Sequence, residues 1–416
     1  MKQLVDVSSM PWLPAIDSSW DVVRADHFLS VKKTVVGERW PDYTLLSLTK
    51  AGVVIRDFTD RQGKLPETFD SYQEVQIGDL VMCLFDMDET PRTVGISSHR
   101  GMITGAYTTF QFDQTIVVPS YFEYLFISID DRKAFKAAYS GLRKTIRPPV
   151  FLSLRFPLPP LETQQRISDY LDRETAEIDA AVADLDRYVE LLEKRRRALV
   201  HETLALRKGP GSELSISDSC RGRVGFVTRL LRRGISPSYV DEGVPVINQK
   251  CVRPGGFLDI DSCRFHDSGA RNIGLDLTIQ PGDTLINSTG TGTLGRSCTV
   301  GEISVPTTWD SHVTLVRPNT DMADPGYLGW TILSQESKLV EFSTGSTNQI
   351  ELSRDTIFNL DFVSIPLELQ KEVSTYLDRE AAEIDSLIAE STTLRDLLLK
   401  RRSALILGVV TGRKQV

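Results

Sequence analysis

Two long segments of the chain repeat apolar residues at the spacing of a helix that packs against another helix. Residues 160–199 and 366–405 each begin at a proline, contain no further glycine or proline, and end near a run of Lys and Arg. A proline at the start and cations at the end suit a helix and its dipole. Apolar residues recur every seven positions, which predicts a coiled-coil seam. The predicted seam consists of Leu171, Ile178, Val182, Leu185, Val189, Leu192 and Leu199 in the first segment and Leu377, Ile384, Ile388, Leu398 and Leu405 in the second.

The two segments are copies of one another. At an offset of 206 residues, 22 of their 40 positions are identical without a gap. The same offset aligns Thr93-Val94-Gly95 with Thr299-Val300-Gly301. The chain is therefore predicted to be two copies of one unit, each a divergent domain followed by a similar helix. Each helix, about 60 Å long at 1.5 Å per residue, finds its obvious partner in the other. The alternative to a coiled coil is that the two segments are ordinary amphipathic core helices.

The divergent regions, about 15–156 and 212–363, have the pattern of mixed α/β domains. Short apolar runs at 79–85, 115–118 and 283–287 predict strands, and residues 121–139 and 327–342 predict helices. The expected fold class is α+β, with two mixed α/β domains joined by two long antiparallel coiled-coil helices in an internal pseudo-twofold repeat. The expected boundaries are 1–156 for the first domain and 157–208 for the first helix. The second domain then covers 209–363, and the second helix with a C-terminal tail covers 364–416.

Composition places the chain among globular proteins. It has 416 residues, of which 41% are hydrophobic and 25% charged. No stretch has the length of apolar sequence that a membrane span needs, and the N-terminus has no apolar signal-peptide core. The five cysteines are scattered without a C-x-x-C pair, which predicts reduced thiols in a cytoplasmic protein. A metal site is the disfavoured alternative, because there are only five histidines and no paired ligand spacing.

The net charge of −8 is unfavourable for a nucleic-acid partner, since phosphates attract Lys and Arg. The charge is uneven, however. Residues 1–156 carry 18 basic and 19 acidic side chains, and residues 209–363 carry 13 and 18. A DNA-binding face would therefore have to be local, with acidic surface facing elsewhere, for example towards a protein partner.

No catalytic motif accounts for the chain. Residues 290–295 fit G-x-G-x-x-G after a predicted strand, but the following residues favour a strand, whereas a dinucleotide site needs a helix there. Glu336 and Lys338 suggest a nuclease site only weakly, because no carboxylate is well placed upstream. The sequence has no P-loop, no nucleophile elbow and no H-E-x-x-H. We therefore expect no catalytic residues, no metal and no cofactor in this chain.

Polar side chains suited to DNA occur in both divergent domains. Arg, Lys, Asn and Gln read base edges in the major groove, and short polar loops contact phosphates. The candidates in the first domain are Arg56, Lys64, Arg92, His99, Arg100, Arg143 and Lys144. Those in the second are Arg232, Arg233, Asn248, Gln249, Lys250, Asn287, Ser288, Thr289, Thr291, Arg296, Asn348 and Gln349. The alternative for each of these side chains is that it is a solvated surface residue. For the loop around residue 290, the alternative is an ordinary hairpin loop.

With these features the chain resembles the specificity subunit of type I restriction-modification systems. The resemblance rests on the pattern from Pro160 to Asp179, its copy from Pro366 to Asp385, the Lys-Arg-Arg-x-Ala-Leu endings, and Gly-Ser-Thr-Asn-Gln before the second helix. The first domain has Gly-Leu-Arg-Lys at the corresponding place, so DNA contacts do not transfer between the halves residue by residue.

The resemblance implies a subunit without activity of its own. Its two target recognition domains would each bind half of a split, asymmetric sequence in double-stranded DNA, and its helices would act as a spacer. Two methyltransferase subunits carrying S-adenosylmethionine would dock on it and methylate flipped-out adenine, and a restriction (motor-nuclease) subunit would join for cleavage. The rivals are a coiled-coil protein–protein adaptor without DNA binding, which the negative charge favours, and a stand-alone enzyme.

Overall fold

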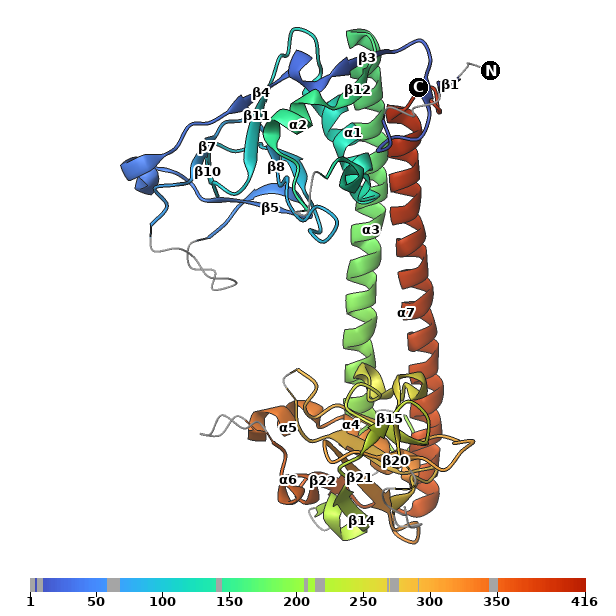
Figure 1. Ribbon diagram of the computed structural model, residues 1–416. Helices are drawn as coiled ribbons and strands as arrows, with labels where there is room; N and C mark the ends of the chain where they lie inside the picture. The colour runs from blue at the N-terminus through green and yellow to red at the C-terminus, as the bar shows by residue number, and fades with distance from the viewer. Residues whose placement is uncertain are drawn as a thin grey trace. The chain divides into compact units, whose positions relative to one another are not determined.

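The computed structural model describes residues 4–5, 10–57, 68–139, 144–205, 209–213, 221–267, 269, 277–290, 292–343 and 351–416 (Figure 1). Contacts divide the chain into two compact units, residues 1–186 with 393–416 and residues 187–392. The division passes through both long helices, whereas the sequence-based boundaries lie between domains and helices. Each unit therefore holds one divergent domain together with a part of each long helix.

The first unit is built from short antiparallel strands and two short helices. Its strands are β1 (Leu4–Val5), β2 (Ile16–Asp17), β3 (Asp21–Arg24), β4 (Leu29–Lys32), β5 (Leu46–Thr49), β6 (Gly52–Ile55), β7 (Gln73–Val75), β8 (Leu80–Met82), β9 (Val94–Ile96), β10 (Gly101–Ile103), β11 (Thr108–Phe112) and β12 (Arg155–Leu158). The helices are α1 (Pro119–Asp131) and α2 (Pro148–Ser153), with 3-10 turns η1 (Ala25–His27), η2 (Gly37–Asp42) and η3 (Ala134–Ala138). Helix α1 lies between the main sheet and the long helix α3 (Leu161–Leu204) (Figure 1).

The second unit has the same kinds of element. Its strands are β13 (Arg221–Arg223), β14 (Thr228–Arg233), β15 (Tyr239–Val240), β16 (Val244–Ile247), β17 (Arg264–His266), β18 (Thr284–Asn287), β19 (Ser297–Thr299), β20 (Thr308–Trp309), β21 (Val313–Pro318) and β22 (Asp361–Val363). Its helices are α4 (Pro325–Leu333), α5 (Glu336–Ser343) and α6 (Arg354–Phe358), with 3-10 turns η5 (Val224–Val227), η6 (Pro254–Gly256) and η7 (Ile260–Ser262). The long helix α7 (Leu367–Val410) follows β22.

The two units share one strand topology. The antiparallel order β4-β11-β8-β9 in the first unit reappears as β14-β21-β18-β19 in the second, and the pair β3–β12 reappears as β13–β22. They differ elsewhere, because the second unit adds a four-stranded sheet, β15-β17-β16-β20, whereas the first has the two-stranded pairs β5–β6 and β7–β10. The α+β class and the internal repeat are thus confirmed, with a common frame and divergent insertions.

Most predicted elements of the domains are present. Strands β8 and β18 lie where apolar runs predicted them. The strand predicted at 115–118 was wrong: Asp113 accepts hydrogen bonds from Thr115 N and Oγ1, which form a turn, and Pro119 then starts α1. The two predicted helices are each interrupted, at Lys133, whose φ is 51°, and between α4 and α5. In the described residues of the glycine-rich loop, 290 and 292–295, no helix starts, and β19 follows the loop.

The long helices are 44 residues each and pack together within each unit. In the first unit Asp179 pairs with Arg402 at 2.8 Å and Asp186 with Arg395 at 3.2 Å. From the first pair to the second, the residue number increases in α3 and decreases in α7, so the two helices run antiparallel. Of the predicted seam residues, Leu171, Ile178, Leu192, Leu199, Leu377 and Ile384 are buried, and the other six are half-buried.

The hydrophobic core of each unit includes both long helices. In the first unit Ile167 and Leu171 of α3 and Ile406 and Val409 of α7 join the domain's aromatic core around Phe126. The corresponding core of the second unit takes Leu192 and Leu199 from α3 and Val373, Leu377 and Ile384 from α7. Burial of this apolar surface, at about 25 cal/mol per Å², is what fastens each domain to the helix pair.

Candidate nucleic-acid interface

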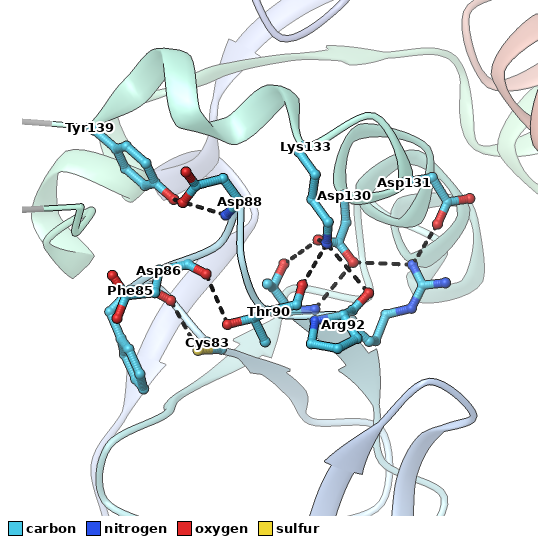
Figure 2. A network of polar contacts seen from close by, with 12 residues as sticks. Cys83, Phe85, Asp86, Asp88, Thr90, Arg92, Asp130, Asp131, Lys133 and Tyr139 are labelled. Carbon is cyan, nitrogen blue, oxygen red and sulfur yellow. Dashed lines mark hydrogen bonds and ion pairs between the residues drawn. The ribbon is translucent and has the colours of Figure 1, made fainter. Parts of the chain in front are cut away.

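In the first domain, Arg92 is held by carboxylates (Figure 2). Its guanidinium lies 3.2 Å from Asp130 Oδ2 and 2.9 Å from Asp131 Oδ1, and its side chain is only 16% exposed. Asp130 is buried, accepts hydrogen bonds from Thr93 N and Oγ1, and pairs with Lys133 at 3.0 Å. These contacts give Arg92 a structural role in joining α1 to the start of β9.

Lys144 pairs with two acidic side chains of the same domain, and Figure 2 shows one of them, Asp88, beside Tyr139. Its ammonium pairs with Asp88 at 3.1 Å and with Glu89, and these two carboxylates raise the pKa of Lys144. Tyr139 donates a hydrogen bond to Asp88 at 2.9 Å, and hydrogen bonds from Lys144 and Tyr139 lower the pKa of Asp88. The positive charge of Lys144 is therefore offset locally.

The remaining candidates of the first domain lie at loop ends. Arg100 is exposed and His99 half-buried, in the turn between β9 and β10 that Ser97 closes by donating a hydrogen bond to His99 O at 2.8 Å. Arg56 follows β6 and is half-buried. Lys64 and Arg143 lie outside the described residues.

In the second domain, several candidates shape the loops instead of facing solvent. Asn287 and Ser288 are buried at the end of β18, where Asn287 Nδ2 donates to Gln249 O at 3.0 Å and Ser288 Oγ lies 2.5 Å from Thr314 Oγ1. Asn248 is 8% exposed, and its Oδ1 accepts a hydrogen bond from Lys250 N at 2.8 Å. These contacts fix the loops after β16 and β18 against one another.

The side chains that those loops present are Gln249, Thr289 and Lys250. Gln249 Nε2 donates to Thr289 Oγ1 at 2.5 Å, and that hydroxyl lies 2.8 Å from His312 Nδ1. His312 and Lys250 are exposed. The sequence analysis missed His312, whose only signal was its position directly before β21. Amide, hydroxyl and imidazole groups together offer donors and acceptors of the kind that base edges use.

Arg233 and Arg296, two candidates of the second domain, donate hydrogen bonds to its backbone. Arg233 pairs with Glu351 and donates to Leu352 O at 3.1 Å, and Arg296 donates to Gly292 O at 2.7 Å. Arg232 is half-buried on β14. Thr291, Asn348 and Gln349 lie outside the described residues. All of these residues stay predictions as DNA contacts.

Each domain is fastened to the long helices by the same polar contacts, which sequence reasoning did not single out. Gln164, buried in the first turn of α3, accepts a hydrogen bond from Val118 N at 2.8 Å and donates to Pro159 O at 2.8 Å and Ile116 O at 3.3 Å. Its counterpart 206 residues later is Gln370. The equivalent contacts of Gln370 are to Asp324 N (2.9 Å), Ile365 O (2.8 Å) and Met322 O (3.2 Å).

Two further pairs repeat at the same offset. Tyr124 of α1 donates to Asp172 at 2.7 Å, and Trp330 of α4 donates to Asp378 at 2.8 Å. The ion pair between Arg402 and Asp179 has its counterpart between Arg196 and Asp385 at 3.0 Å. The repeat at offset 206, visible in the sequence, was the signal that could have found them.

The described residues contain no group of three or more His, Cys, Asp or Glu side chains that could hold a metal ion. The helices of the described part of the chain include none that is long and apolar enough to span a membrane. Glu336 and Lys338 have structural partners: Glu336 accepts hydrogen bonds from Ser297 N and Oγ, and Lys338 pairs with Asp361 at 3.0 Å.

Each unit thus has its own, unlike domain, attached to segments of α3 and α7 by side chains that correspond at an offset of 206 residues. A similar fold occurs in a solved chain from a study described as "Structural basis underlying complex assembly and conformational transition of the type I R-M system". That chain is 13% identical, with a TM-score of 0.69, and the match covers 96% of this chain and 99% of that chain. Also similar is the HsdS subunit from Thermoanaerobacter tengcongensis, at 15% identity and a TM-score of 0.48, with 97% and 98% covered.

Residues 104–183 match the family model described as "Type I restriction modification DNA specificity domain". The matched segment includes α1, α2, β12 and the first part of α3, which are the elements that join the first domain to the long helix. Over these residues the chain is similar to a type I restriction modification DNA specificity domain, which is the family that its sequence motifs resemble.

Proposed function

We propose that the chain is the DNA-reading, non-catalytic specificity subunit of a type I restriction-modification complex in the cytoplasm. The observation that carries the proposal is the duplicated attachment of two unlike domains. Gln164 and Gln370 make equivalent hydrogen bonds, and the Asp179–Arg402 and Arg196–Asp385 ion pairs are equivalent, while the additional sheets of the two domains differ. A common frame with divergent insertions suits one protein that reads two different half-sites.

The DNA contacts would come from the divergent loops. In the second domain Gln249, Lys250, Thr289 and His312 offer a mixed set of donors and acceptors, and in the first domain Arg100 is exposed beside His99. The target would be one bipartite, asymmetric sequence, because the two domains present different side chains. The helix pair would fix the distance between the half-sites, as dimer geometry does in other DNA-binding proteins.

The partners would be two methyltransferase subunits that carry S-adenosylmethionine, with a restriction subunit for cleavage. A repeated apolar surface supports two copies of one partner. On α3, Tyr188 and Leu191 are 44% and 54% exposed, and at the same offset on α7, Leu394 and Leu397 are 50% and 56% exposed. Exposed apolar side chains, repeated on two similar helices, suit the same protein contact made twice.

Binding to DNA in the presence of the methyltransferase subunit tests the function. We expect sequence-specific affinity whose logarithm falls linearly with the logarithm of salt concentration, because phosphate contacts release counterions. Exchange of residues 212–363 for another such domain should change one half-site only. A change in both half-sites would contradict independent readers.

The second candidate function is a coiled-coil protein–protein adaptor, favoured by the net charge of −8. An adaptor would bind the methyltransferase without adding affinity for any particular DNA sequence. The same titration separates the two functions, since the adaptor predicts identical DNA affinity with and without this chain.

A further inference from the structure

Two cysteine side chains of the second domain lie close together. Cys251 Sγ and Cys263 Sγ are 3.9 Å apart without a bond between them. Cys251 is completely buried, and Cys263 is half-buried. A disulfide needs a sulfur–sulfur distance of about 2.05 Å. The two sulfur atoms are thus within a small side-chain movement of bonding.

The surroundings of Cys251 favour its thiolate. Its sulfur accepts a hydrogen bond from Asn248 N at 3.4 Å and lies 3.9 Å from the sulfur of Cys263. The contact with the Cys263 side chain lowers the pKa of Cys251, and the hydrogen bond from Asn248 N adds to this, while burial opposes both. The thiolate is the reactive form of cysteine. Cys251 is therefore the nucleophile of the pair, and Cys263 is placed to resolve its oxidised form.

We propose that Cys251 and Cys263 are a redox-sensitive pair that hydrogen peroxide converts into a disulfide within the second domain. The Cys251 thiolate attacks one peroxide oxygen, the O–O bond breaks, and hydroxide leaves, which gives a sulfenic acid. Cys263 loses its proton and attacks that sulfur, and the sulfenic oxygen leaves as water. In total, two thiols and one peroxide give one disulfide and two waters, and a small thiol reductant reverses the change.

The disulfide would link the two ends of the loop from Cys251 to Cys263, and this loop contacts the long helix α3. Within the loop Asp259 N donates to Cys251 O at 2.8 Å, and Arg253 pairs with Asp259 at 2.7 Å. At its tip Gly255 O accepts a hydrogen bond from Arg196 at 2.7 Å. A covalent link across the base of this loop would stiffen the attachment of the domain to α3.

The same disulfide would change the hydrogen bonding of the turn that presents Gln249. Asn248 N donates to the sulfur that would move, and Cys251 N donates to Asn248 O at 2.9 Å. Gln249 in that turn contacts Asn287 and Thr289. The consequence for DNA, which rests on the proposed function, is a redox effect on the second half-site alone. Loss of one such hydrogen bond, about 1 kcal/mol, corresponds to about fivefold weaker binding.

Mass spectrometry of the full chain tests the disulfide without DNA. After titration with hydrogen peroxide, we expect the intact mass to fall by two hydrogen atoms and a peptide that links Cys251 to Cys263, both reversed by dithiothreitol. Cys83→Ser, in the other unit, should still form the link, whereas Cys263→Ser should gain oxygen at Cys251 without a link. Oxygen addition without a link in the wild-type chain, thiols that stay free, or a link between other cysteines would overturn the proposal.

A binding titration then tests the consequence. With the methyltransferase subunit present, the oxidised chain should bind the intact target about fivefold more weakly than the reduced chain, and Cys251→Ser, which has no thiolate at that position to oxidise, should show no such change. Equal affinities of linked and reduced chains would refute the effect on reading. Failure of the reduced chain to bind any specific sequence would instead count against the proposed function, because the mass measurement needs no DNA.

Discussion

Replacement of Gln164 by Leu tests how the first domain is fastened to α3. The amide is buried and makes hydrogen bonds to Val118 N, Pro159 O and Ile116 O. Leucine has a similar volume but leaves these groups without their partner. A buried polar group left unsatisfied costs about 1–3 kcal/mol, so the loss of the two shorter bonds alone should cost about 3 kcal/mol.

The assay is hydrogen–deuterium exchange followed peptide by peptide, because a chain with two units does not unfold in one two-state step. Gln164→Leu should raise exchange in the first unit and leave the second unit unchanged. Gln370→Leu, the counterpart 206 residues later, should do the reverse. The matched control is the neighbouring Gln165→Leu, because the Gln165 side chain is exposed and its amide donates a hydrogen bond to Asp169 at 2.8 Å. This change should alter stability by less than about 0.5 kcal/mol. The reasoning is refuted if Gln164→Leu exchanges like Gln165→Leu.

Three further predictions concern the helices and one buried acid. Leu191→Glu and Leu397→Glu should each remove one of two bound methyltransferase copies, as measured by native mass spectrometry. The control is Leu161→Glu, which changes another exposed leucine of α3. Two copies retained in both variants would exclude these residues as the docking surface. Removal of one heptad from each long helix should shorten the gap between half-sites by about 10.5 Å, or about three base pairs, and an unchanged gap would mean that the helices do not set it. Burial raises the pKa of Glu336, so the folded chain holds that proton more tightly than the unfolded chain, and stability falls as pH rises above about 4.3. Glu336→Gln keeps an acceptor for Ser297. The urea midpoint of its second unit, followed by hydrogen–deuterium exchange of peptides from that unit, should lack this decline between pH 4 and 7. An equal decline would assign the effect to other groups.

The sequence predicted the long helices well because their signals are local and repeated. The seven-residue spacing of Leu171, Ile178 and Leu185, without an internal glycine or proline, leaves few alternatives to a helix. The apolar run at 115–118 misled because Val and Ile favour strands, while Asp113 and Pro119, which decide the outcome, lie just outside it. Short-range patterns therefore predicted the long helices correctly and failed where two side-chain hydrogen bonds and a proline set a turn.

The candidate DNA contacts were harder to predict, because residue type does not show what a side chain faces. Arg92 suits phosphate chemically, yet Asp130 and Asp131 hold it within the domain. Asn287 suits a base edge, but its amide bonds to Gln249 O below the surface. His312 was overlooked, although the fold brings it to Thr289 from a distant part of the chain. Such pairings depend on tertiary contacts between loops, which no local pattern encodes.

The most direct test of the account is a map of methylated adenines in the genome of a host that expresses this chain with its methyltransferase subunit. Two unlike readers on one helix pair predict methylation at a single bipartite sequence with two different halves and a fixed gap. A continuous or palindromic methylated sequence, or the same methylation without this chain, would contradict the account.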